Sequence, residues 1–296
     1  MVLKIKQGVV LKTLQLAHSP DADDIFMYYA IKFGWVNGNL GFENQALDIQ
    51  TLNDEALKGT YDVSAISFAL YPLIRNDYAL LKTAVSFGEG YGPKLIKKRG
   101  AKLKRNFKAA LSGAHTTNAL LFRAAYPEAR IIYKNFLDIE NAVLSGEADA
   151  GVLIHESILN FDDTLEVERE IWDVWVDFVK SDLPLPLGGM ALRRSIPLLR
   201  AIECEEILTR AVLVAINCKK QLSKMLLERN LVRVDDKALE KYLNLYANDQ
   251  SVSMSEKQLD AVDKLFEIGF NAGFYDERIG CRDYLIPLEY KKDRYS

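Results

Sequence analysis

Short apolar runs and amphipathic stretches alternate through the first two thirds of the sequence. Apolar runs that end in Gly, Ser, Asp or Thr are typical of buried strands, as at residues 14–17 and 149–154. The amphipathic stretches between such runs are typical of helices. Alternation of this kind predicts parallel βαβ units and therefore an α/β fold.

Two segments, residues 53–67 and 139–155, share one construction. Each predicts a short amphipathic helix that ends at a glycine suited to a left-handed C-cap, followed by an Asp that opens an apolar strand. The two strands lead to Ser67 and His155. Because ligands bind at the carboxyl ends of strands in open α/β sheets, we expect two similar lobes that bring both residues to a shared cleft.

Two Gly- and Pro-rich segments, residues 86–98 and 181–195, predict crossovers between these lobes. Beyond them the pattern becomes helical over residues 195–228 and 236–246. A further helix is expected from Ser255, where S-E-K-Q indicates a capping box. The second half of the chain is therefore predicted to be mostly helical.

Ser19 is predicted to cap the first helix, which extends to about Phe33. The first turn of this helix carries three carboxylates, Asp21, Asp23 and Asp24. Together with His18 they could form an oxygen-rich metal site, but carboxylates that compensate the helix dipole explain the same residues without a metal. We therefore predict no metal site, and His18 stays open between a ligand contact and a structural role.

The length of 296 residues favours two domains, and the net charge of -3 creates no overall basic field. Neither nucleic acid nor an anionic membrane is therefore an expected partner, and a small molecule is the better default. Residues 97–108 are strongly basic. We interpret them as a solvated connection, with anion steering or a nucleic-acid patch as the alternative.

The sequence also restricts the compartment. It contains no run of about 18 apolar residues, and lysines interrupt the apolar N-terminal stretch, so neither a membrane span nor a secretory signal is predicted. Its three cysteines lie far apart without C-x-x-C spacing, which indicates neither a disulfide framework nor a zinc site. We expect a cytoplasmic protein, and its oligomeric state stays open.

Each of the three histidines, His18, His115 and His155, lies where an apolar run breaks into small polar residues. Because histidine titrates near neutrality, each is a candidate general base. Spacing alone leaves His155 open between a catalytic or ligand contact and a structural role. After His115, the residues Thr116, Thr117 and Asn118 can cap a helix whose first N–H groups would also attract an anion.

Motifs for several familiar chemistries are absent. The sequence has no G-x-S-x-G, no G-x-x-x-x-G-K-[ST] and no second His at zinc-protease spacing from His155. The glycines of residues 88–92 lack the dinucleotide-binding spacing. The sequence therefore predicts no bound nucleotide or other cofactor.

Six motifs in order resemble the 1,4-dihydroxy-6-naphthoate synthase family: HSPDADDIFMYYA, SAISFALY, GEGYGP, SGAHTTNALL, GVLIHES and LPLPLGGMALRR. They extend over about residues 14–194. The resemblance implies a fold like that of type II periplasmic binding proteins, in which two α/β lobes flank a central cleft and the chain crosses between them twice. Residues 1–95 with 191–296 would form the larger lobe, and residues 96–190 the smaller inserted lobe.

The resemblance further implies a cofactor-free lyase of menaquinone biosynthesis. Such an enzyme converts a small carboxylated substrate, cyclic dehypoxanthine futalosine, into 1,4-dihydroxy-6-naphthoate and a sugar-derived fragment. In the family the His of I-H-E-S, here His155, is the proton acceptor. The family's substrate contacts fall on Ala65, Ile66, Ser67, Thr117 and Asn118.

One motif departs from the family pattern, which often reads S-P-C-P-N-D. In this chain Asp21 and Asp23 stand where that pattern has Cys and Asn. An ionised Asp23 would offer only acceptors, which puts the amide contact of the usual Asn in question. Residues after 195 receive no functional role from the motifs.

Two other functions fit a lobed architecture. One is a cytoplasmic protein that binds a small carboxylate without chemistry, and the other is chorismate dehydratase. The missing export signal argues against a periplasmic receptor but not against a cytoplasmic sensor. The I-H-E-S and H-T-T motifs argue against the dehydratase.

Overall fold

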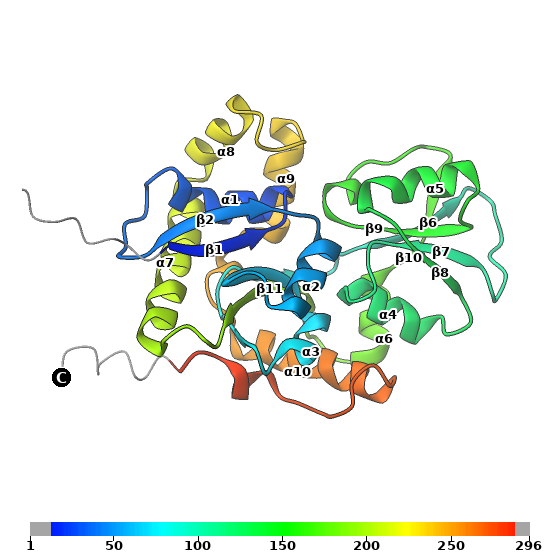
Figure 1. The fold of residues 1–296 in the computed structure, drawn as a ribbon. Coiled ribbons are helices and arrows are strands. Elements are labelled where there is room, and N and C mark those ends of the chain that lie inside the picture. Colours follow the sequence, from blue (N-terminus) through cyan, green and yellow to red (C-terminus); the bar gives the residue numbers. More distant parts are fainter. Residues whose placement is uncertain (1–12, 288–296) are drawn as a thin grey trace, which may run out of the picture.

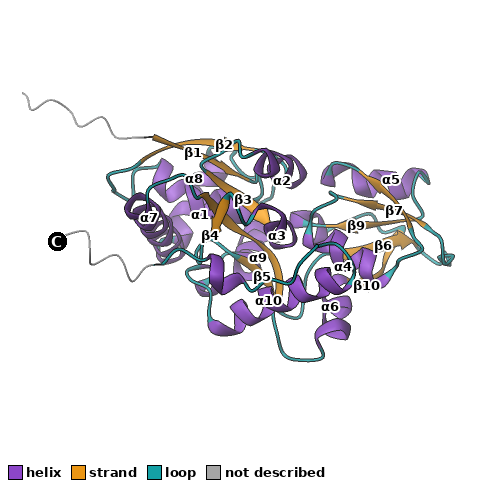
Figure 2. Ribbon diagram, turned by 60° about the horizontal axis from the view of Figure 1, so that its bottom comes forward, coloured by secondary structure: helices purple, strands orange, loops and turns teal. Residues whose placement is uncertain are grey.

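The computed structural model describes residues 13–287 and contains two β-sheets, each covered by helices (Figure 1). The first sheet has the strand order β2-β1-β3-β11-β4, with β5 paired to β11, and the second has the order β10-β6-β9-β7-β8. The two sheets and their helices form neighbouring bodies in both views (Figure 2). The predicted two-lobed α/β architecture is thereby confirmed.

The strands are β1 (Thr13–His18), β2 (Gly41–Ala46), β3 (Val63–Ser67), β4 (Tyr78–Leu80), β5 (Ser86–Gly88), β6 (Lys94–Lys98), β7 (Lys108–Leu111), β8 (Arg130–Tyr133), β9 (Ala150–Leu153), β10 (Leu165–Glu170) and β11 (Leu185–Arg193). As the βαβ pattern predicts, β1 is parallel to β2 and β3, and β7 is parallel to β8 and β9.

The α-helices are α1 (Ala22–Lys32), α2 (Ile49–Lys58), α3 (Tyr71–Ile74), α4 (Thr117–Ala125), α5 (Ile139–Ser145), α6 (Ile171–Val179), α7 (Leu198–Asn217), α8 (Lys219–Glu228), α9 (Asp236–Tyr246) and α10 (Glu256–Asn271). Two short 3-10 helices, η1 (Phe68–Leu70) and η3 (His155–Ile158), follow β3 and β9 closely. The positions just after these strands are therefore tight turns.

The chain leaves the first sheet after β5 and enters the second at β6. It returns at β11, which runs antiparallel to β3 and places Gly188 opposite Ser67. The chain therefore passes from the first sheet to the second at residues 89–93 and returns to the first sheet after β10. The lobe limits of residues 1–95, 96–190 and 191–296 stay a prediction.

The repeated helix–strand construction is present in both lobes. Gly59 ends α2 with a φ of 68°, and Gly146 ends α5 with a φ of 81°. Both glycines thus occupy the left-handed conformation that side chains disfavour, as predicted. Further along, Ser255 and Gln258 form the predicted capping box of α10.

The predicted start of the first helix is wrong by two residues. The helix α1 begins at Ala22 instead of Pro20, and its N-cap residue is Asp21 instead of Ser19. The reason is that the first hydrogen bond of the helix runs from the N–H of Ile25 to the carbonyl of Asp21, which makes Asp21 the N-cap residue. The side chain of Asp21 makes no capping hydrogen bond to the backbone of its own helix and contacts the side chains of Asp23 and His155 instead.

The apolar core extends through both lobes. Leu16 and Phe68 are fully buried in the first lobe, and Phe122 and Trp175 in the second. Among residues 13–287, no helix is long and apolar enough to cross a membrane. The prediction of no secretory signal rests on an N-terminal stretch that lies mostly outside these described residues.

Candidate active site

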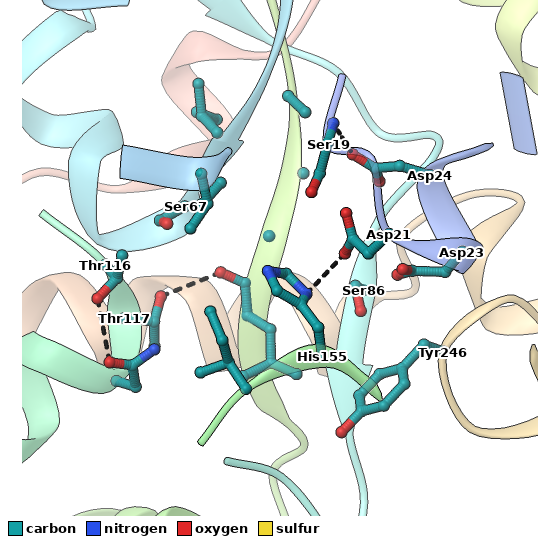
Figure 3. Close-up of a pocket in the computed structure, with 18 of the residues that line it drawn as sticks. Ser19, Asp21, Asp23, Asp24, Ser67, Ser86, Thr116, Thr117, His155 and Tyr246 are labelled. Atoms are coloured by element: carbon teal, nitrogen blue, oxygen red, sulfur yellow. Dashed lines mark hydrogen bonds and ion pairs between the residues drawn. The ribbon is translucent and has the colours of Figure 1, made fainter. Parts of the chain in front are cut away.

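A cavity of about 730 Å³, including solvent at its mouth, opens between the two sheets. It is lined by the ends of β3 and β9, the N-termini of α1 and α4, the first half of β11 and two tyrosines of α9 (Figure 3). All six residues of the predicted site line this cavity: Ala65, Ile66, Ser67, Thr117, Asn118 and His155. Their assigned roles stay predictions.

His155 begins the 3-10 helix η3 directly after β9, with a left-handed φ of 54°. The imidazole Nδ1 lies 2.6 Å from Oδ2 of Asp21, and the ring packs edge-on against Phe136 at a centroid distance of 4.9 Å. The Nε2 atom is buried and has no hydrogen-bond partner among the described residues. A rare backbone conformation and two side-chain contacts therefore fix the ring and leave one nitrogen free.

Asp21 and His155 each shift the pKa of the other. Burial raises the pKa of Asp21, but His155 outweighs burial and holds that pKa below its usual range. Burial lowers the pKa of His155, but Asp21 outweighs burial in turn and raises that pKa above its usual value. When His155 is neutral, the hydrogen bond to Asp21 places its proton on Nδ1 and leaves the Nε2 lone pair for a ligand.

Glu156 makes a second contact between the same two elements. Its Oε1 accepts a hydrogen bond from the backbone N–H of Ala22 at 2.9 Å, and its Oε2 lies 3.4 Å from Arg233. The N-terminus of α1 in the first lobe is thus bound to the turn after β9 in the second lobe by both Asp21 and Glu156. These contacts join the two lobes beside His155.

Three polar residues beside Asp21 complete this side of the cavity: Ser19, Asp23 and Asp24. Burial and the charge of Asp21 raise the pKa of Asp24 to about 7 and that of Asp23 well above its usual value. The hydroxyl of Ser19 is buried without a partner among the described residues, whereas the carboxyl group of Asp23 hydrogen-bonds to Asp21. This side therefore carries one ionised carboxylate, Asp21, beside Asp23, whose protonated form is favoured, and Asp24, which is about half protonated near pH 7.

The other side of the cavity is uncharged. Ser67 is fixed by the buried Asn53, whose amide donates to the Ser67 hydroxyl oxygen at 3.1 Å and accepts from the Ser67 backbone N–H at 3.0 Å. The hydroxyl proton of Ser67 thus remains available to a ligand. Sequence reasoning missed Asn53, because its only signal was a polar residue within an amphipathic helix.

The N-terminus of α4 adjoins Ser67 on this uncharged side. Thr116 caps α4 through its hydroxyl, which accepts from the N–H of Ala119. The Thr117 hydroxyl donates to the carbonyl of Leu187 at 3.1 Å and lies 3.4 Å from the N–H of Ala69, so it connects α4 to the first lobe. By helix geometry the N–H groups of Thr117 and Asn118 have no acceptor within α4. They form a partly positive end that suits an anion.

Ala65 and Ile66 contribute the wall of the cavity from β3, where they pair with Met190 and Gly189 of β11. A side chain at Gly189 would collide with the ring of Phe68, since an added Cβ would lie 2.9 Å from Cζ. Glycine at this position therefore lets β11 pass close to η1.

Tyr242 and Tyr246 of α9 also line the cavity, although the motif analysis gave the C-terminal third no role. Both are buried, and burial raises their pKa values well above the usual range, so both hydroxyls stay protonated. Their spacing of one helical turn was a visible signal. Equally spaced aromatic residues usually mark a core face, and one sequence cannot separate these meanings.

The other two histidines do not line the cavity. His18 is buried, with Nδ1 2.7 Å from the carbonyl of Ser19 and Nε2 3.1 Å from the amide of Asn44. Both ring nitrogens of His18 are thus satisfied, which resolves the open question in favour of a structural role. His115 lies on a separate hollow beside Arg123 and Phe274 and precedes the start of α4, as expected.

The alternative of a metal site on the first helix finds no support in the donor geometry. Within residues 13–287 no three His, Cys, Asp or Glu side chains are grouped so as to hold a metal ion. The carboxylates of α1 face His155, Ser19 and one another instead.

Comparison with known proteins relates this architecture to two groups. The sequence profile described as menaquinone biosynthesis matches residues 14–271. A 1,4-dihydroxy-6-naphthoate synthase of Thermus thermophilus is 27% identical over 86% of this chain and 93% of its own length. The enzyme of the same name from Streptomyces coelicolor is 26% identical, over 84% and 90%.

Solved structures show the same fold. A crystal structure of an Archaeoglobus fulgidus protein superposes with a TM-score of 0.82 at 33% identity, and covers 88% of this chain and 98% of its own. The alkanesulfonate-binding protein of Xanthomonas axonopodis pv. citri has a TM-score of 0.67 at 10% identity, over 94% and 99%. The expected fold like that of periplasmic binding proteins is confirmed.

Proposed function

The chain belongs to the menaquinone biosynthesis family, and from this premise we propose that it is a lyase that converts cyclic dehypoxanthine futalosine into 1,4-dihydroxy-6-naphthoate. His155 is the general base. The observation that carries the proposal is its geometry, with Nδ1 held by Asp21 and Nε2 buried in the cavity without a partner. The names of the Thermus and Streptomyces relatives support the same reaction.

The proposed step begins when the neutral imidazole of His155 accepts a proton from a substrate hydroxyl at Nε2. The electron pair of the O–H bond forms a carbonyl, the adjacent C–C bond breaks, and its electron pair passes into the ring system of the product. The imidazolium of His155 then donates the proton to the ring system of the product, which has received this electron pair. Because electrons and protons balance within the substrate, the step requires no redox cofactor.

Binding in this proposal uses the uncharged side of the cavity. The Ser67 hydroxyl and the first N–H groups of α4, at Thr117 and Asn118, hold the carboxylate of the substrate, while Ala65 and Ile66 contact the ring system. Enclosure between the lobes keeps water from the reacting atoms. Closure depends on the contacts of Asp21 and Glu156 with the opposite lobe.

Turnover of the cyclic substrate tests the proposal. Purified protein should release the naphthoate chromophore, and His155→Asn should lower kcat about 10²- to 10⁴-fold because the general base is lost. The same change at His115, which lies outside the cavity, is the matched control and should retain the rate. No release by the unaltered protein, or equal release by His155→Asn, contradicts the lyase. Recovery of intact bound substrate would indicate a binding protein instead.

A further inference from the structure

The cavity has two chemically different ends, which lie on opposite sides of His155 (Figure 3). At one end are Ser67 and the start of α4, which offer hydroxyl and N–H donors without charge. At the other end are Ser19, Asp21 and Asp23 at the start of α1. The ends would select different parts of one ligand.

The α1 end contains a buried hydroxyl group that no described residue satisfies. Ser19 is 3% exposed, and its Oγ has no hydrogen-bond partner among the described residues. Asp23 is 4% exposed, lines the same wall of the cavity and hydrogen-bonds through its carboxyl group to Asp21. A buried hydroxyl left without a partner beside the oxygens of a carboxyl group indicates a polar ligand.

Charge decides which part of a ligand fits there. Asp21 is ionised through its contact with His155 and would repel a carboxylate at this end. The start of α4 attracts one instead, since its first turn contains no acidic residue. A carboxylated ligand can therefore enter in only one favourable orientation.

We propose that Ser19 and Asp23 form a subsite for the uncharged, hydroxylated, sugar-derived part of the substrate. This inference rests on the proposed function and deepens it. The substrate carboxylate then lies at α4, the hydroxyl groups lie at α1, and the bond that breaks lies between them beside Nε2 of His155.

The protonation of Asp23 agrees with this role. Burial and the charges of Asp21 and Asp24 raise its pKa well above the usual value, which favours the protonated carboxyl group, and a hydrogen bond to Asp21 stabilises that form further. The other titratable groups that act on it or feel its charge are Glu156 of η3, Tyr242 and Tyr246 of α9, and Tyr91 before β6. A neutral carboxyl group can donate and accept as an Asn amide does. A protonated Asp at this position of S-P-C-P-N-D can therefore donate to Asp21, as an Asn amide could, and accept from a substrate hydroxyl.

Binding measurements with two ligands test the subsite. At pH 7, the KM of the intact cyclic substrate and the inhibition constant of 1,4-dihydroxy-6-naphthoate are measured as apparent affinities in a protein that keeps His155, because His155 holds Asp21 ionised. Asp23→Ala should lower the affinity for the intact substrate about tenfold or more, because the hydroxyl groups of the substrate lose their partner. The affinity for the naphthoate should change by less than about twofold. Asp23→Asn should recover most of the lost affinity, and Ser19→Ala should cost a few-fold.

The naphthoate affinity also reports whether each variant is folded, because naphthoate needs only the α4 end. Equal losses for both ligands, or no loss for the intact substrate, overturn the subsite. Turnover by the unaltered protein is decided separately. Its absence would overturn the proposed function and the subsite together, whereas turnover with equal losses for both ligands overturns the subsite alone.

Discussion

The helices α1 and α4 both present their N-termini to the cavity, yet the two ends have opposite electrostatic character. The start of α1 carries Asp21, Asp23 and Asp24, whereas the first turn of α4 contains no acidic residue. Both helix ends are partly positive. At α1 side-chain carboxylates compensate that charge, and at α4 it is left for a ligand. The side chains of the first turn, more than the helix itself, therefore decide what a helix end binds.

The largest effect is expected from Asp21→Asn, which removes the ionised carboxylate of the α1 end. We expect kcat to fall about 100-fold or more, because an amide can hold the imidazole in the wrong tautomer. The pKa of His155 should also fall, since Asp21 raises it. The neutral base forms as pH rises through that pKa, so the acid limb of the pH–rate profile should move to lower pH.

The pH dependence of kcat in both proteins measures this effect. Asp163→Asn, a change at an exposed position of the second lobe, serves as the control and should leave the profile in place. An acid limb that does not move in Asp21→Asn would show that Asp21 does not position the base.

An intermediate effect is expected at the uncharged end. Thr117→Val removes the hydroxyl that joins α4 to Leu187 and leaves the carbonyl of Leu187 without this donor. We expect the dissociation constant of 1,4-dihydroxy-6-naphthoate to rise about five- to tenfold, since a lost hydrogen bond of this kind costs about 1 kcal/mol or slightly more. Thr209→Val, which removes a hydroxyl bonded within α7, is the matched control. An unchanged affinity would show that the Thr117 hydroxyl does not position the start of α4 for the ligand.

The smallest effect should come from Glu156→Gln. The amide oxygen can still accept from the N–H of Ala22, so only the interaction with Arg233 and one negative charge near His155 are lost. Because Arg233 is 38% exposed, the ion pair contributes about 1 kcal/mol at most, and kcat/KM should fall less than about fivefold. A loss as large as that of Asp21→Asn would mean that closure, and not the orientation of the base, limits the reaction.

Local signals predicted much of the fold. The left-handed glycines after α2 and α5, the limits of α9 and the capping box of α10 all depend on residues close together in sequence. The candidate site was predicted only in part. His18 and His155 follow similar apolar runs, but one ring is satisfied by Asn44 and the other faces the cavity.

The partner of His155 could not be predicted for the same physical reason. Asp21 was expected to compensate the dipole of its own helix, and its carboxylate instead binds a ring in the other lobe. That choice depends on how the two lobes meet. The spacing of residues within a single sequence does not show how two lobes meet.

The place of β11 also has a consequence for the order in which the protein can form on the ribosome. In space β11 lies between β3 and β4, but along the chain it follows every strand of the second sheet. During synthesis the second sheet can therefore be complete while β3 still presents an unpaired edge. A nascent chain stopped before residue 185 would expose that edge as a template for aggregation. The first lobe, although it begins the sequence, is the one that must finish last.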